Sequence, residues 1–320
     1  MQRIQGAIGI YTTMKQKNLL TLTVSAVLIT SATASVTMDW VTVGNAGNAA
    51  QSASNRMHSA SGGDGYGAVS YAYQIGKYEV TNAQYGAFLN AAAKTDSYGL
   101  YRTFMSSYGI TRSGSSGSYT YSVTEALANR PVVLVSWFDA ARMANWMMNG
   151  QGSGSTETGA YTLNGATSGI VLANAGAQVY IPTEDEWYKA AYYNGATSTY
   201  SLYPNGQNSI TTADANSDWS VGSSRDVGTY SGDASSYGTF DQGGNVFEWN
   251  DAVTDSKRGL LGGGWDTSLE GLASSFRYAV DPSYENHPAT GFRLASAIPE
   301  PSAILLTIFA GGAALIRRKR

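Results

Sequence analysis

The most informative segment of the 320-residue chain is Gly238-Thr239-Phe240-Asp241-Gln242-Gly243-Gly244-Asn245-Val246-Phe247-Glu248-Trp249. Its two adjacent glycines predict a tight turn, because glycine adopts backbone angles that are closed to other residues. Such a turn can direct the carboxylates of Asp241 and Glu248 toward one point. The carbonyls of Gly244 and Val246 can face the same point, and calcium prefers several hard oxygen ligands of this kind. The alternative is that Glu248 pairs with an arginine and the glycines only turn the chain.

Four further segments accompany this one. They are residues 73–85 (YQIGKYEVTNAQY), residues 131–140 (PVVLVSWFDA), residues 181–187 (IPTEDEW), and Gly262-Gly263-Gly264-Trp265 leading to Gly291-Phe292-Arg293. Together and in this order, the five segments resemble the formylglycine-generating enzyme (sulfatase-modifying factor) family over residues 36–297. The resemblance implies a single α+β domain of the C-type-lectin-like kind, with small antiparallel sheets, flanking helices and much irregular structure.

The residues for the family's chemistry are missing. Oxidases of the family bind copper through two cysteines in the segment after the Gly-Gly-Ser-Trp-like turn, and this chain has no cysteine. The corresponding stretch offers only oxygen groups, from Asp266, Thr267, Ser268 and Glu270. Hard oxygen ligands do not replace a soft dithiolate for monovalent copper. We therefore expect no copper and no oxidation of a substrate cysteine.

The two histidines do not supply another catalytic centre. Related sulfoxide synthases of the same fold use a histidine-rich iron site, whereas this chain has only His58 and His287, which we expect in exposed loops. No Gly-x-Ser-x-Gly elbow is present for a serine nucleophile. We interpret the domain as non-catalytic and used for binding. The alternative is an oxidoreductase-type sulfatase-modifying enzyme with altered, non-cysteine chemistry.

The resemblance also bears on calcium. Family members with this pattern hold a structural calcium at the positions of Asp241, Gly244, Val246 and Glu248. A second, weaker calcium site would fall near Asn216 and Ser217, although the neighbouring ligands do not align clearly here.

Buried aromatic and charged residues are expected within the five segments. Core aromatics are predicted at Tyr78, Trp137, Trp187, Phe247 and Trp249. Carboxylates lie beside them at Glu79, Asp139, Glu184 and Glu186, and partly buried carboxylates need partners, such as Arg142, Arg277 or Arg293.

Local patterns predict several elements. Alternation predicts a strand over residues 69–75, and apolar residues predict another over 131–137. Helices are expected after a Thr81 cap, over residues 139–148, and after Thr183, whose spacing to Glu186 is that of a capping box. The Ser- and Gly-rich stretches 112–121 and 149–176 are expected as exposed loops, the first as a hairpin or loop, and both as candidate binding loops.

Both ends carry targeting patterns. Lys15 and Lys17 precede an apolar run and small residues, which predicts a signal peptide over residues 1–34, with either Met1 or Met14 as the start. In the segment 298–320, Pro299-Glu300-Pro301, a short apolar run and Arg317-Arg318-Lys319-Arg320 resemble the PEP-CTERM sorting signal. In that family an exosortase removes the tail. An ordinary single-helix membrane anchor is the alternative.

These patterns predict an exported protein of the cell surface, outer envelope or extracellular space. Its expected partners are signal peptidase, exosortase, the inner membrane transiently through the C-terminal segment, and an exopolysaccharide or other surface ligand. Without the two end segments, the body has 13 basic and 22 acidic residues, a net charge of about −9. This balance argues against nucleic acid as a partner, since phosphate binding requires clustered Lys and Arg. The lack of cysteine also excludes disulfides.

Overall fold

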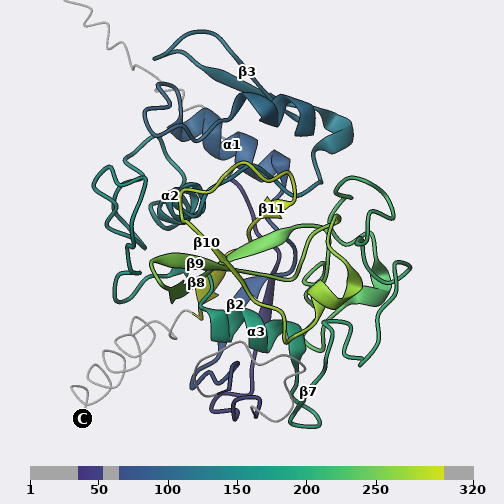
Figure 1. Cartoon of the computed structure of the whole chain (residues 1–320). Helices are drawn as coiled ribbons and strands as arrows, with labels where there is room; N and C mark the ends of the chain where they lie inside the picture. The colour runs from purple at the N-terminus through teal and green to yellow at the C-terminus, as the bar shows by residue number, and fades with distance from the viewer. Residues whose placement is uncertain (1–34, 53–64, 299–320) are drawn as a thin grey trace, which may run out of the picture. The chain divides into compact units, whose positions relative to one another are not determined.

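The computed structural model describes residues 35–52 and 65–298 (Figure 1). The chain divides into two units, Met1–Ser35 and Val36–Arg320, and every described helix and strand belongs to the second. The predicted signal peptide, His58 and the Pro299-Glu300-Pro301 motif lie outside the described residues. Within the described ranges, no helix combines the length and the apolar character needed to cross a membrane.

Short strands outnumber helices in the described part. The strands are β1 (Trp40–Val43), β2 (Tyr73–Gly76), β3 (Ile110–Ser113), β4 (Thr120–Val123), β5 (Val179–Tyr180), β6 (Tyr193–Asn194), β7 (Thr199–Tyr200), β8 (Phe247–Thr254), β9 (Lys257–Leu261), β10 (Tyr278–Val280), β11 (Thr290–Gly291) and β12 (Ala295–Ala297). The α-helices are α1 (Asn82–Ala92), α2 (Trp137–Met148) and α3 (Glu184–Tyr192). Short 3-10 helices are η2 (Thr103–Tyr108), η3 (Glu125–Leu127), η4 (Ser231–Asp233) and η5 (Leu269–Leu272).

Two four-stranded sheets form the framework. One has the order β1-β2-β12-β5 and is antiparallel throughout. The other has the order β10-β9-β8-β11, in which β11 runs parallel to β8 with Thr290 opposite Phe247. The pairs β3–β4 and β6–β7 are small hairpins. The α+β class with small, mostly antiparallel sheets and flanking helices is therefore confirmed, with one parallel pair added.

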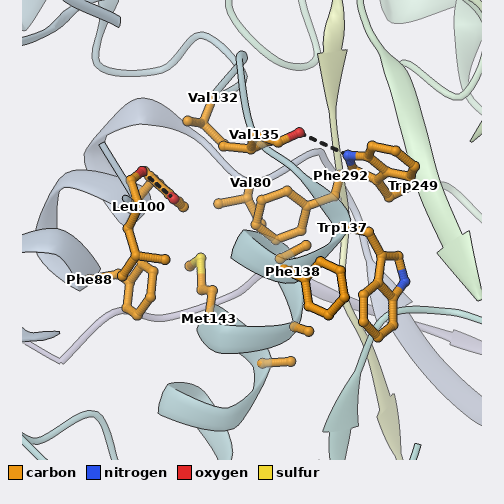
Figure 2. Close-up of a cluster of buried hydrophobic side chains, with 14 of the residues drawn as sticks. Val80, Phe88, Leu100, Val132, Val135, Trp137, Phe138, Met143, Trp249 and Phe292 are labelled. Atoms are coloured by element: carbon orange, nitrogen blue, oxygen red, sulfur yellow. Dashed lines mark hydrogen bonds between the residues drawn. The ribbon is translucent and has the colours of Figure 1, made fainter. Parts of the chain in front are cut away.

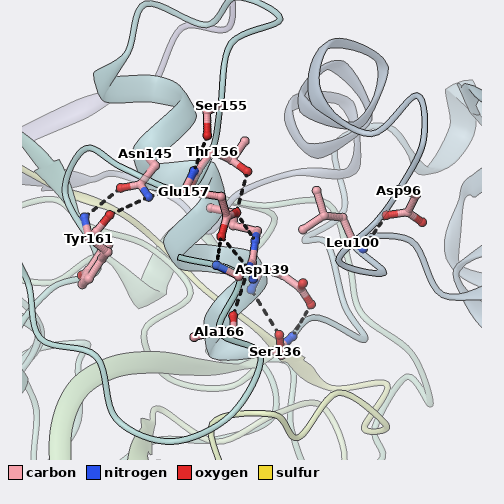
Figure 3. Close-up of polar contacts among 12 residues, drawn as sticks. Asp96, Leu100, Ser136, Asp139, Asn145, Ser155, Thr156, Glu157, Tyr161 and Ala166 are labelled. Atoms are coloured by element: carbon pink, nitrogen blue, oxygen red, sulfur yellow. Dashed lines mark hydrogen bonds and ion pairs between the residues drawn. The ribbon is translucent and has the colours of Figure 1, made fainter. Parts of the chain in front are cut away.

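Each α-helix begins at a capping box, in which the cap side chain accepts from the backbone N–H of the third helical residue and the side chain of that residue accepts from the cap N–H. Thr81 caps α1 and Thr183 caps α3, as predicted. Helix α2 begins two residues earlier than expected, because Ser136 caps it: Asp139 Oδ2 accepts from Ser136 N at 2.8 Å (Figure 3). Residues 112–121 lie within the β3–β4 hairpin, as expected.

Of two predicted strands, one is absent and the other is shorter than predicted. The segment 131–137 is buried but forms no strand, and Pro131 makes only an isolated bridge to Thr81. Leu134 has φ +62°, which interrupts an extended chain, so burial and not sheet pairing explains these apolar residues. The strand predicted over 69–75 is shorter, starting at Tyr73, since Val69 N instead donates to Asn48 Oδ1.

The main core surrounds α2 (Figure 2). Phe138 and Met143 of the helix are buried among side chains from the sheets and loops, including Phe292. Trp249 Nε1 donates to the carbonyl of Val135 at 2.9 Å, so an indole of β8 satisfies the backbone of the loop before α2. Of the predicted core aromatics, Tyr78 is only half-buried and the other four are buried.

The Gly/Ser/Thr-rich stretch 149–176 is attached to the core instead of projecting freely. Asn145 of α2 donates to Thr156 O and accepts from Tyr161 N at 2.8 Å (Figure 3). Buried Arg142 pairs with Glu157 at 2.8 Å and donates to the carbonyl of Ala166. Asn145 and Arg142 of α2 therefore attach residues 156–166 of this stretch to the core.

Candidate functional site

The Gly-rich turn leads into β8 and places Glu248 in the interior. Glu248 and Arg293 are both fully buried and form a bidentate pair, with Nε to Oε2 and Nη2 to Oε1 each at 2.6 Å. Trp187 Nε1 also donates to Oε2 at 2.7 Å. The alternative left open by the sequence, that Glu248 pairs with an arginine, is what the structure contains.

The turn itself requires its glycine. Gly244 has φ +90°, and a Cβ there would lie 2.4 Å from the carbonyl oxygen of Asn216. Asp241, at the start of the turn, also has positive φ and accepts from Gly228 N through Oδ2 at 2.6 Å. The turn therefore packs directly against the loop of Asn216, which explains why only glycine fits.

Three buried carboxyl groups surround the single guanidinium of Arg293. Burial raises the pKa of Glu79 well above its usual range, and the charges of Asp241 and Glu248 raise it further. Burial also raises the pKa of Asp241 to about 6, although Gly228 N–H and Arg293 oppose the rise. One guanidinium cannot neutralise three carboxylates, so the cluster needs protons or a cation.

Calcium at Asp241, Gly244, Val246 and Glu248 stays a prediction. In the part of the chain that the structure describes, no three Asp, Glu, His or Cys side chains form a metal cluster. A calcium ion would therefore depend on backbone carbonyls and on carboxylate oxygens that already accept hydrogen bonds. The excess negative charge favours a cation here, whereas the bidentate bonds of Glu248 favour the purely structural alternative.

The weaker calcium pair lies against this turn. Asn245 N donates to Asn216 O at 2.8 Å, and Asn216 Nδ2 donates to Asn245 Oδ1 at 3.1 Å. Asn216 Oδ1 and Ser217 Oγ are buried without a hydrogen-bond partner. Two unsatisfied oxygens are a donor set that a cation could use, so the second site also stays a prediction.

The expected partners of the buried carboxylates are partly correct. Glu184 pairs with Arg277 at 2.5 Å. Glu186, however, accepts from the hydroxyls of Tyr71 and Tyr180 instead of from an arginine, and Asp139 uses its carboxylate in the helix cap. The physical reason is local: both Glu186 and Asp139 occupy the third helical position, where the backbone of the cap residue claims an oxygen.

A cavity of about 330 Å³ opens beside the segment that follows Gly264-Trp265. Four aromatic rings line it, from Phe247 of β8, Phe276, Tyr278 of β10 and Tyr284. The ring centroid of Phe247 lies 6.4 Å from that of Phe276 and 6.0 Å from that of Tyr278. Leu260 and the polar residues Asp266, Thr267, His287 and Thr290 complete the lining.

His287 is not the freely exposed loop residue expected from the sequence. Its Nε2 lies 3.2 Å from Asp266 Oδ2, and its Nδ1 accepts from Ala289 N at 3.3 Å. The ring also packs edge-on to Phe247. Sequence reasoning had singled out Asp266 and Thr267 separately but could not join them to His287, because the contact spans about twenty residues of irregular chain.

An exposed tryptophan lies next to the same segment. Trp219 is 62% exposed and makes an edge contact with Trp265, with ring centroids 4.7 Å apart. Its φ is +56°, an unfavourable conformation for a bulky residue. Two backbone bonds hold this conformation, Trp219 N to Trp265 O at 2.9 Å and Asp218 N to Thr267 O at 2.8 Å. The fold thus holds an exposed indole against the segment that carries Asp266 and Thr267 of the cavity lining.

Residues 35–298 match the family described as the sulfatase-modifying factor enzyme 1-like domain. The chain belongs to this family. Treponema denticola variable protein 1 is a similar solved structure, with TM-score 0.58 and 22% identity over 83% of this chain and 97% of that one. CarF is another, with TM-score 0.53 and 20% identity over 82% and 99%. These likenesses support the fold alone, and no curated protein sequence matches the chain.

The copper of the family's oxidases does not fit this member. The chain contains no cysteine, and the segment after the Gly-Gly-Gly-Trp turn contributes Asp266 and Thr267 to the cavity lining. Carboxylate and hydroxyl oxygens are poor ligands for monovalent copper. His287 Nδ1 accepts from Ala289 N and its Nε2 lies 3.2 Å from Asp266 Oδ2, so both ring nitrogens already face protein groups.

A second, polar cavity of about 250 Å³ lies at the start of α2. Asp139, Arg102, Arg142 and Glu285 line it, and Arg102 forms an ion pair with Glu285. Burial raises the pKa of Asp139 to about 6, while the Ser136 hydrogen bonds and Arg102 oppose the rise. With acids beside both arginines, this cavity has no net positive charge for an anion.

Proposed function

We propose that this family member is an exported, non-catalytic binding domain that attaches to polysaccharide at the cell surface or in the extracellular matrix. The observation that carries the proposal is the aromatic cavity, whose lining includes Asp266, Thr267 and Phe276 from the stretch compared above with the family's copper-binding segment, and which contains no thiol. Apolar and aromatic pockets with a few polar groups are typical of ligand sites.

The surroundings of the cavity support a binding role. Trp219 and Tyr278 expose 62% and 50% of their surface, and both belong to elements that border the cavity or its lining segment. Exposed rings of this kind stack on the apolar faces of sugar rings. The positive φ of Trp219 costs conformational energy, and such strain is commonly found at functional sites.

Export rests on the sequence patterns at the two ends, which lie outside the described residues. Residues 1–34 have the pattern that signal peptidase recognises. The segment 298–320, with Pro299-Glu300-Pro301, supports transient insertion in the inner membrane followed by exosortase processing. The acidic body, at about −9, is consistent with a partner that is not nucleic acid.

The proposal is tested by co-sedimentation of the full-length chain with extracellular polysaccharide from bacteria that produce it. We expect Trp219→Ala to lower the bound fraction severalfold. Phe104→Ala is the matched control, because Phe104 is 76% exposed but does not line the cavity. Equal loss in both variants, or no binding by the parent chain, would contradict the proposal. Stoichiometric copper or iron in the purified chain would instead support the enzymatic alternative.

A further inference from the structure

The aromatic cavity has an uneven charge balance. None of its nine lining residues is Lys or Arg, and Asp266 is its only acidic group. His287 Nδ1 accepts from Ala289 N at 3.3 Å, and its Nε2 lies 3.2 Å from Asp266 Oδ2. The lining therefore places one carboxylate among the rings, with no Lys or Arg beside it.

The rings add a second attraction for a positive charge. Phe247 packs at a tilt against both Phe276 and Tyr278, at interplanar angles of 37° and 39°. The faces of aromatic rings carry negative electrostatic potential, which attracts cations within about 6 Å, and cages of such rings recognise quaternary ammonium groups. A carboxylate beside several rings is the usual composition of such a cage.

The polar groups of the cavity are already paired. Asp266 Oδ2 lies 3.2 Å from His287 Nε2, and Asp266 Oδ1 accepts from Thr267 Oγ1 at 3.5 Å. Thr267 Oγ1 in turn accepts from Gly264 N at 3.0 Å. Thr290 Oγ1 lies 3.4 Å from His287 Nδ1. A primary ammonium group brings three hydrogen-bond donors that would find few free acceptors here. A quaternary ammonium group has no N–H to satisfy.

We propose that this cavity binds an organic cation of the quaternary ammonium class, such as a trimethylammonium group carried on the matrix ligand. Its volume of about 330 Å³ lies at the small end of the usual range for ligand pockets, about 300–1,000 Å³. The inference rests on the proposed binding function and adds the chemical class of the group that enters the cavity.

The test uses two probes of nearly equal shape, choline and its neutral carbon analogue 3,3-dimethylbutan-1-ol, titrated into the full-length chain by calorimetry. We expect choline to bind at least about tenfold more tightly than the alcohol. Tyr278→Leu should weaken choline binding about tenfold, whereas Tyr278→Phe, which keeps the ring, should not. Asp266→Asn, which keeps an acceptor oxygen beside His287, should weaken the binding of choline and leave the affinity for the alcohol unchanged.

The outcomes separate this inference from the proposed function. Equal affinities for the two probes would show an apolar pocket without cation selectivity and overturn the inference. Polysaccharide binding that depends on Trp219, with no binding of either probe, would overturn the inference and leave the binding function intact. Absence of both polysaccharide and probe binding would overturn both.

Discussion

Substitution of Glu248 by Gln tests whether the buried ion pair is the main structural role of the Gly-rich turn. Glu248 and Arg293 have no exposed side-chain surface and bond at 2.6 Å. Glutamine keeps the volume and one acceptor oxygen, which can still accept from Trp187, but removes the carboxylate charge that bonds directly to Arg293. Breaking a buried pair on one side costs about 3–5 kcal/mol, because the remaining charge stays in the interior.

The expected shift in melting temperature follows from the size of the domain. For about 150–250 residues, each kcal/mol changes the Tm by about 2–4 °C, so Glu248→Gln should lower it by about 6–20 °C. Arg293 keeps its bonds to the carbonyls of Gly76 and Phe240, which favours the smaller end of this range.

Glu285→Gln is the matched control for this experiment. Glu285 pairs with Arg102, but the two side chains are 20% and 35% exposed. Pairs accessible to water contribute about 0–1 kcal/mol, so this variant should lose at most about 4 °C. The assay is thermal unfolding followed by circular dichroism at neutral pH. If Glu248→Gln melts no lower than Glu285→Gln, Arg293 does not depend on Glu248 and the structural assignment is wrong.

Four other predictions concern the cation, pH, activity and the tail. If calcium binds at the Gly-rich turn, a chelator should lower the Tm of the parent but not that of Asp241→Ala. The parent's free energy of unfolding should fall by up to about 2.7 kcal/mol when the ion is a hundredfold above its Kd, and parent melting curves that superimpose with and without chelator would contradict the calcium assignment. Burial raises the pKa of Asp139 from 3.8 to about 6, so the folded state holds this proton more tightly than the unfolded chain does. Its stabilising contribution, about 3 kcal/mol, is complete below pH 3.8 and lost as pH rises through about 6. Asp139→Asn keeps an acceptor for Ser136 N but cannot titrate, so its free energy of unfolding, measured by urea titration, should fall less over this pH range. The chain should form no formylglycine on a cysteine-containing sulfatase peptide with or without copper, which mass spectrometry would detect as an aldehyde product. A chain ending at Ile298 should be released to the periplasm or medium, whereas the full chain first fractionates with membranes; equal retention would contradict the sorting role of the tail.

Several features follow from sequence because their causes are local. The capping boxes at Thr81 and Thr183 each involve residues three positions apart, so the same side chains make the same bonds wherever the helix lies. The absence of thiols likewise excludes dithiolate copper in any fold. The five segments, in their order along the chain, were sufficient to predict the family and its α+β architecture.

Local patterns failed where burial alone shaped the segment. Residues 131–137 are as apolar as a strand, but Leu134 adopts a positive φ and the carbonyl of Val135 bonds to the indole of Trp249. An apolar composition indicates burial and does not indicate which backbone groups pair in a sheet. The sequence pattern therefore could not predict that the carbonyl of Val135 bonds to Trp249 instead of to a neighbouring strand.

The candidate site was decided by contacts between distant residues. The sequence predicted calcium at Glu248 and left an arginine partner as the alternative, and the fold brings Arg293, 45 positions away, against both of its oxygens. The aromatic cavity arises because β8, β10 and the irregular segment carrying His287 meet around Phe247. The sequence specifies which side chains are present. Their charges and bonding partners depend on which segments pack together and bury them from water, and this burial exists only in the folded chain.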